Sequence, residues 1–135
     1  MDTLTPTQRS ERMARVLNKD TKPEMYVRRL VYSKGYRYRL HVRALPGTPD
    51  LVFSKAKKVI FVHGCFWHRH PGCGRLPKSK KRFWVTKLEQ NRRRDLCNLR
   101  KLRRRGWKVL VLWECELSQR RLGDKITFFL EDKNA

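Results

Sequence analysis

Acidic residues are scarce in this chain: of 135 residues, 12 are Asp or Glu and 34 are Lys or Arg, which gives a formal net charge of +22. Such an excess repels itself in a free monomer and indicates a polyanionic partner. The basic residues are interleaved with aromatic and β-branched residues, unlike those of a disordered basic tail. No helical pattern combines one purely apolar face with one purely basic face, so nucleic acid is favoured over a membrane surface.

Long apolar runs are absent as well. No segment is apolar over enough residues to span a bilayer, and the N-terminus, MDTLTPTQRSER, lacks the apolar region of a signal peptide. We therefore expect a cytoplasmic protein with no membrane partner, in which the 4 cysteines stay reduced. In that compartment, a cysteine close to a histidine indicates a metal ligand before it indicates a disulfide.

Repeats, low-complexity segments and interdomain linkers are also missing from the sequence. A chain of this length can bury one modest core but not two, so we expect a single domain over residues 1–135. Within it we distinguish a basic N-terminal helix (1–20), a core (21–117) and a C-terminal helix (118–135).

Local signals place two helices before the first strand. A basic pattern around Met13 predicts a short helix over residues 7–17. The run Thr21-Lys22-Pro23-Glu24 is a capping box that begins a second helix, and Gly35 ends it. Polar and apolar residues then alternate over residues 36–42, which predicts a half-exposed strand.

The remaining pattern is strand, strand, helix, strand, helix. Residues 51–53 and 59–62 are short apolar strands, and a long helix follows over residues 82–105. Residues 107–113 are continuously apolar in their middle, which predicts a buried central strand, and a last helix covers residues 122–130. This order predicts an α/β fold, a single domain with a mixed central β-sheet flanked by helices.

Soft ligands are concentrated in the stretch VHGCFWHRHPGC, residues 62–73. Cys65, His70 and Cys73 lie on one short loop, and Cys115 follows the last predicted strand, which together make a common structural zinc set. The alternative is that Cys65 and Cys115 are ordinary buried thiols and His70 is a surface residue. We favour zinc because so short a loop cannot build a core of its own. Cys97, inside the long helix, is expected to pack.

A carboxylate interrupts the apolar face of the long helix. Leu88, Asp95, Leu99 and Leu102 fall on one side of it, and a carboxylate there is costly to bury without a partner. Two interpretations remain open: a salt bridge to an arginine, or a carboxylate that orients a histidine and stabilises its charged form.

Other side chains in this region also have two interpretations. His63 ends a predicted strand, where a histidine is more often a surface or core residue than a catalyst, but Asp50 begins the neighbouring apolar strand. Glu24 already has a structural role in the capping box, which makes a catalytic role the weaker reading. Phe66 and Trp67, taken alone, are expected to be core residues.

The motifs together resemble the very-short-patch-repair DNA mismatch endonucleases, a branch of the PD-(D/E)xK nuclease superfamily. The similarity runs from about residue 9 to residue 117. The segments that carry it are LPGTPD (45–50), VIFVHGCFWH (59–68), Phe83-Trp84, Asn91, Asp95, Gly106-Trp107 and Trp113-Glu114-Cys115.

This resemblance implies a restriction-endonuclease-like α-β-β-β-α-β core with a catalytic magnesium site. Asp50 resembles the aspartate that binds the catalytic Mg²⁺, with the backbone carbonyl of Val62 as another ligand and Glu24 bound through water. The Glu-x-Lys of the superfamily is absent, and His63 stands where its lysine would. His68 and Asp95 resemble the histidine–aspartate pair of the site.

The same resemblance implies roles for the cysteines and the aromatic residues. Cys65, His70, Cys73 and Cys115 resemble the structural zinc ligands of the family, although the loop is less rich in histidine here and the ligating histidine is open between His68 and His70. Phe66 and Trp67, with Met13, resemble residues that wedge into DNA beside a mismatch.

The implied activity is that of a Mg²⁺-dependent, strand-specific DNA endonuclease. It would nick duplex DNA 5′ of the thymine in a T:G mismatch, which arises when 5-methylcytosine deaminates, and so start very short patch repair. We expect a monomer in the bacterial cytoplasm, at the nucleoid through DNA binding, with other repair proteins as further candidate partners. The alternative is a zinc-stabilised, non-catalytic nucleic-acid-binding module, which leaves Asp50 and Asp95 unexplained.

Overall fold

The computed structural model describes residues 21–70, 73, 76 and 78–132. The predicted N-terminal helix, with Met13, lies outside the described residues. The described elements are, in chain order, α2 (Lys22–Ser33), β1 (Arg39–Leu40), β2 (Leu51–Phe53), β3 (Lys58–His63), α3 (Lys81–Arg104), β4 (Lys108–Trp113), the 3₁₀-helix η1 (Glu114–Glu116) and α4 (Leu122–Glu131).

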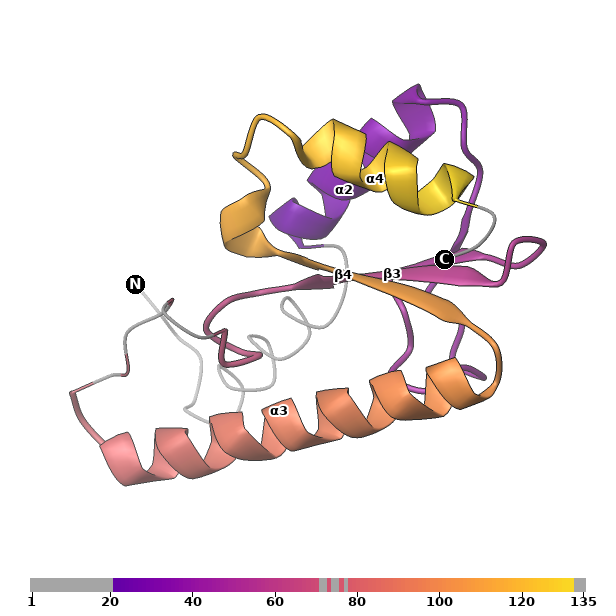
Figure 1. Ribbon diagram of the computed structural model, residues 1–135. Helices are drawn as coiled ribbons and strands as arrows, with labels where there is room; N and C mark the ends of the chain where they lie inside the picture. Colours follow the sequence, from indigo (N-terminus) through magenta and orange to yellow (C-terminus); the bar gives the residue numbers. More distant parts are fainter. Residues whose placement is uncertain (1–20, 71–72, 74–75, 77, 133–135) are drawn as a thin grey trace, which may run out of the picture.

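The strands form one mixed sheet with the order β1-β2-β3-β4. The pairs β1–β2 and β2–β3 are antiparallel, and β3–β4 is parallel with His63 opposite Trp113. Helices α2 and α4 lie on one face of this sheet and α3 lies on the other (Figure 1). The prediction of a mixed sheet flanked by helices is therefore confirmed.

Alternation along β3 divides the core between the two faces. Ile60 belongs to the cluster under α2 and α4, together with Val27 and Ile126. Val59 and Phe61 belong to the second cluster, together with Leu102 of α3. Since successive side chains of a strand point to opposite faces, a strand covered on both sides must be apolar throughout.

The prediction that residues 107–113 form a buried central strand is wrong in its position, because these residues form the edge strand β4. Within the described part of the chain β4 is an edge strand of the sheet, and the two internal positions belong to β2 and β3. Only Leu112 of β4 is fully buried. Its continuous apolar run has a different cause, because the helices that cover both faces of the sheet extend over this edge strand as well.

The predicted strand over residues 36–42 is also mostly wrong. Only Arg39 and Leu40 pair with β2, and the backbone at His41 takes a φ of 48°. Tyr36 and Tyr38 nevertheless pack against the core under α2 and α4. The alternation therefore indicated correctly which side chains are covered, although most of this backbone does not form the hydrogen bonds of a strand. Cys97 is exposed, which contradicts its expected packing role.

The sequence signals for helix ends predicted the structure better than the signals for strands. The Thr21 hydroxyl accepts a hydrogen bond from the Glu24 N–H at 3.3 Å, and Gly35, at a φ of 93°, follows the end of α2 as predicted. At the other end of the chain, the Lys58 ammonium donates to the backbone carbonyls of Phe129 and Asp132 at 2.7 and 2.6 Å, which fastens the end of α4 to the start of β3. Among the described residues, none of the helices combines the length and apolarity that crossing a bilayer requires.

Candidate active site and metal cluster

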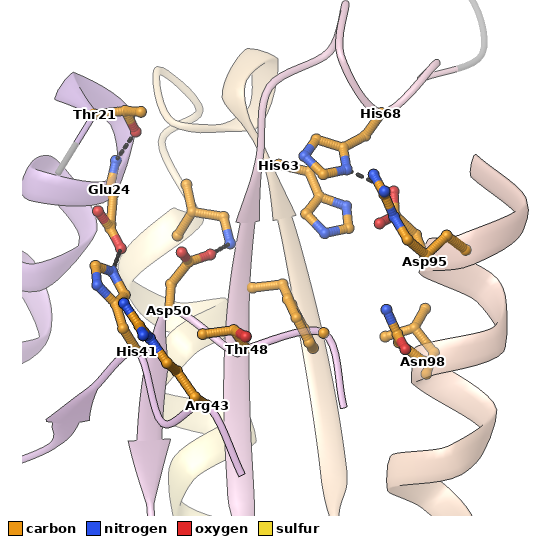
Figure 2. A pocket seen from close by; sticks show the side chains of 15 residues that line it. Thr21, Glu24, His41, Arg43, Thr48, Asp50, His63, His68, Asp95 and Asn98 are labelled. Carbon is orange, nitrogen blue, oxygen red and sulfur yellow. Dashed lines mark hydrogen bonds and ion pairs between the residues drawn. The ribbon is translucent and has the colours of Figure 1, made fainter. Parts of the chain in front are cut away.

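A cavity of about 700 Å³ lies between the N-terminal end of α2 and the middle of α3, where β2 begins and β3 ends (Figure 2). The antiparallel pairing of β2 with β3 brings the start of one strand and the end of the other to the same edge of the sheet. All six residues implied for the catalytic site line this cavity: Glu24, Asp50, Val62, His63, His68 and Asp95.

Asp50 is anchored at the floor of the cavity. Its Oδ2 accepts a hydrogen bond from the backbone N–H of Val62 at 2.7 Å. Burial, together with the nearby Glu24, raises the pKa of Asp50 to about 8, although the Val62 N–H and Arg28 oppose the shift. A carboxylate that is this costly to ionise becomes favourable when a cation binds beside it.

Glu24 turns its carboxylate toward Asp50 rather than back over its own helix end. The side chain is 2% exposed, and its two oxygens have different partners. Oε2 lies 3.0 Å from an Arg28 nitrogen, and Oε1 lies 2.5 Å from Nε2 of His41. The capping hydrogen bond from the Glu24 N–H to Thr21 is therefore present, while the carboxylate of Glu24 lines the cavity.

Glu24, His41 and Asp50 each offer one ligand atom, and these atoms lie within 4.8 Å of one another. A buried carboxylate and a half-buried one this close match the oxygen ligands that Mg²⁺ prefers. His41 was missed by the sequence analysis. Its place in the alternation put it among the exposed side chains of a strand, and no local signal marked its ring as part of a site.

Asp95 is paired with a histidine, as the second interpretation of its sequence pattern expects. Its Oδ2 lies 2.5 Å from Nδ1 of His68, and among the described residues its recorded partner is this histidine and not an arginine. With the Nδ1 proton donated to the carboxylate, Nε2 of His68 keeps a lone pair. Such a histidine can accept a proton from water or a hydroxyl group.

His63 is 5% exposed and stacks on His68, with ring centroids 3.8 Å apart and planes at 3°. Burial, followed by the neighbouring His68, lowers the pKa of His63 to about 4, so its ring is neutral at pH 7. Its buried Nδ1 has no hydrogen-bond partner among the described residues. His63 thus presents a neutral ring to His68.

A second cluster lies beyond the carboxyl ends of β3 and β4. Cys65, His70, Cys73 and Cys115 each present one ligand atom within 4.8 Å of the others, and Cys115 Sγ lies 3.5 Å from His70 Nδ1. Parallel pairing of His63 with Trp113 explains the meeting, since Cys65 and Cys115 each follow two residues after that pair. His70, rather than His68, lies with the three cysteines, which favours His70 as the histidine of this cluster.

The chemistry of this set fits zinc. Three sulfurs and one imidazole nitrogen are a usual tetrahedral combination, and their spread matches a common centre. Burial raises the pKa of the Cys65 thiol, so the thiolate form is unfavourable in this environment without a cation. The His70 ring also stacks on Trp113, with centroids 4.2 Å apart, which orients the imidazole.

Phe66 and Trp67 are half-buried, so the expectation of ordinary core residues does not hold. They meet edge to face at 5.1 Å, and both contact Trp84 of α3 at centroid distances of 5.6 and 5.9 Å. Asn91 donates to the Trp67 carbonyl at 3.2 Å. These three side chains form an aromatic cluster, Phe66, Trp67 and Trp84, that connects the loop after β3 to α3.

Fold and cavity define an α/β protein with a candidate hydrolytic site that contains carboxylates and a histidine–aspartate pair. A family model described as "DNA mismatch endonuclease Vsr" matches residues 1–74. A type II nicking enzyme of Xanthomonas oryzae, V.XorIIP, is 52% identical over 119 residues, which are 87% of each chain. V.NmeAIP, a type II nicking enzyme of Neisseria meningitidis, is 44% identical over 88% of this chain and 86% of its own.

DNA mismatch endonuclease Vsr of Escherichia coli K12 is 38% identical over 83% of this chain and 72% of its own. The chain therefore belongs to the Vsr family of DNA endonucleases, and its resemblance to the mismatch endonucleases is confirmed. Among these relatives, one name specifies mismatches and others specify nicking.

Proposed function

We propose that this chain is a Mg²⁺-dependent endonuclease that nicks one strand of duplex DNA on the 5′ side of the thymine in a T:G mismatch. The observation that supports it most is one cavity that combines the carboxylates of Glu24 and Asp50 with the His68–Asp95 pair. Family membership supports DNA cleavage, and the Escherichia coli relative named a mismatch endonuclease supports the mismatch as substrate.

In this proposal Asp50 and the Val62 carbonyl would hold Mg²⁺ directly, and Glu24 would hold it through water. A bound Mg²⁺ supplies stabilisation of the negative charge that develops on the scissile phosphate and the leaving oxygen. The protein contributes rigidity: the Val62 N–H orients Asp50, and Arg28 restrains Glu24.

His68 is the proposed general base. Asp95 holds its Nδ1, so Nε2 takes the proton of the water that attacks phosphorus, and Asp95 stabilises the resulting imidazolium. The neutral His63 ring lies flat against His68 and limits its rotation. As the water oxygen bonds to phosphorus, the P–O bond to the leaving oxygen breaks, that oxygen takes a proton from solvent, and His68 releases its own proton to solvent.

The cysteine cluster is proposed to hold a structural Zn²⁺ that fixes the loop carrying Phe66 and His68. Phe66 and Trp67, with Met13 of the N-terminal segment, are proposed to wedge between base pairs at the mismatch. Residues 1–20 would then contact DNA, residues 21–117 would form the nuclease core, and the whole chain would act as one domain and as a monomer. Arg and Lys side chains would neutralise phosphates without reading sequence.

The test is nicking of labelled duplexes that carry T:G or T:A at one position, with and without Mg²⁺. We expect the parent protein to cut only the T-containing strand of the T:G duplex, and Asp50→Ala to abolish cutting with duplex affinity retained. Equal cutting of both duplexes would remove mismatch specificity from the proposal. No cutting of either duplex, with binding intact, would favour the non-catalytic alternative.

A further inference from the structure

His41 occupies an unusual backbone position at the edge of the catalytic cavity. It follows the last residue of β1, and its φ of 48° lies in the left-handed region, which residues other than glycine seldom adopt. Strain of this kind persists only where surrounding contacts hold it, and it is concentrated at functional sites. Here the conformation directs the ring into the cavity, toward Glu24 (Figure 2).

The contact of His41 with Glu24 is short and complements that of Arg28. Nε2 of His41 donates to Oε1 of Glu24 at 2.5 Å, and Arg28 donates to Oε2 at 3.0 Å. Each oxygen of the carboxylate therefore has its own donor, one from helix α2 and one from the segment after β1. Two donors on opposite oxygens prevent the carboxylate from rotating, which a single donor would allow.

His41 also lies close enough to Asp50 to be considered a metal ligand itself. Its chemistry argues against that role for Mg²⁺, which prefers oxygen ligands. Moreover, Oε1 of Glu24 at 2.5 Å and an Arg28 nitrogen at 3.3 Å already surround Nε2, so the ring nitrogen nearest the carboxylates is engaged by protein groups rather than open to a cation. An orienting role is consistent with both facts, because partners that hold metal-binding carboxylates by hydrogen bonds tune metal affinity.

We propose that His41 is a positioning residue that fixes the Glu24 carboxylate for divalent-cation binding in this cavity. The inference rests on the proposed function, because it takes the cavity to be the cation site of the nuclease. It adds a residue to that site that acts through Glu24 and contacts neither the cation nor the phosphate.

The experiment removes the ring in two ways and restores its donor in a third. His41→Gly accepts a positive φ without strain, and His41→Asn tolerates it while leaving the side chain too short to reach Glu24. His41→Gln carries an N–H donor at about the original reach. Leu40→Ala, at an exposed neighbour outside the cavity, is the matched control for disturbance of β1.

Mn²⁺ is the probe, titrated into the zinc-loaded full-length protein without DNA, and Asp50→Ala identifies the signal from the cavity. We expect His41→Gly and His41→Asn to weaken Mn²⁺ binding by about 10-fold, and His41→Gln to recover most of that loss. In nicking assays, kcat should fall with KM for DNA unchanged. Leu40→Ala should match the parent protein in both measurements.

A double-variant comparison tests whether His41 acts through Glu24. Once Glu24→Gln is present, adding His41→Gly should weaken Mn²⁺ binding no further, because the group that His41 orients is gone. Fully additive losses would overturn the inference, as would His41 variants that bind Mn²⁺ like a parent protein with an Asp50-dependent signal. A parent protein without that signal and without nicking would overturn the proposed function and this inference together.

Discussion

At the scale of single residues, the ionised carboxylate of Asp50 works against the stability of the fold in the absence of a cation. Asp50 is anchored by one backbone N–H, yet burial and Glu24 keep its pKa near 8. In the unfolded chain an aspartate has a pKa of about 4. The folded state therefore binds a proton more tightly than the unfolded state between these values, and stability falls as pH rises through that window.

Replacing Asp50 by Asn should remove this dependence. Asn keeps an acceptor for the Val62 N–H, so we expect the cation-free variant to be more stable than the parent by about 5 kcal/mol at pH 8.5 and similar to it near pH 4. Urea unfolding at both pH values, in buffer without Mg²⁺ and without chelators that strip the cysteine cluster, measures the difference. Mg²⁺ should then stabilise the parent and leave the variant unchanged. A constant gap at both pH values would mean that ionisation of Asp50 is not its source.

His68 and Asp95 form the second residue pair whose role can be measured. We expect His68→Ala and Asp95→Asn each to lower the nicking rate by roughly 100-fold or more with DNA affinity retained, since general acid–base catalysis contributes about that much. The double variant should be little worse than either single variant, because the two side chains act as one unit. If Asp95→Asn lowers only the free energy of unfolding and its folded fraction nicks normally, the carboxylate is structural.

At the scale of elements, the loop after β3 depends on a cluster that is completed by η1. Cys65, His70 and Cys73 come from this loop, while Cys115 comes from the segment after β4. We expect Cys73→Ser and Cys115→Ser to lose bound zinc and to destabilise the fold by several kcal/mol, because metal binding at such a site is coupled to folding. Zinc content and thermal unfolding measure both effects.

Cys97→Ser is the matched control for that prediction. Its thiol lies exposed on α3, away from the cluster, so zinc content and unfolding temperature should stay at the parent values. Cluster variants that keep both their zinc and their stability would contradict the structural role of the metal.

Elements also differ in how far local sequence predicted them. Helix α2 was predicted correctly at both ends, because Thr21 and Gly35 act on the backbone within one turn. Strand β1 was overestimated and β4 was misplaced in the sheet. Alternation and apolar runs indicate which side chains are covered, but they do not indicate which strands are neighbours in the sheet.

At the scale of the whole molecule, the charge of +22 and the aromatic cluster predict two separable components of DNA binding. Phosphate contacts by Lys and Arg set affinity and its salt dependence, whereas rings inserted between base pairs sense how easily those pairs unstack. Phe66, Trp67 and Trp84 are held rigidly by contacts with one another beside the loop of His68.

We therefore expect Phe66→Ala and Trp67→Ala to reduce the preference for T:G over T:A duplex, with the salt dependence of binding nearly unchanged. A T:G wobble is already poorly paired, so the unstacking cost of a few kcal/mol is lower there. Competition binding with both duplexes at several salt concentrations checks this. Folded variants that discriminate as well as the parent would show that these rings only support the loop.

The sequence by itself determined the parts of this protein that depend on neighbouring residues. The caps of α2, the long helix, the apolar strands and the Cys65-His70-Cys73 loop can all be read locally, because each signal lies within a few residues of its effect. The family resemblance, carried by the same local motifs, was also available from the sequence and is confirmed.

Only the tertiary structure decided which side chains meet. Parallel pairing of β3 with β4 brings Cys115 to Cys65, and the same loop sends His70 to the cysteines and His68 to Asp95. A left-handed backbone after β1 adds His41 to Glu24, where no pattern had marked it. The physical reason is that strand register and loop direction are set by packing between distant segments, and no local period of the sequence encodes them.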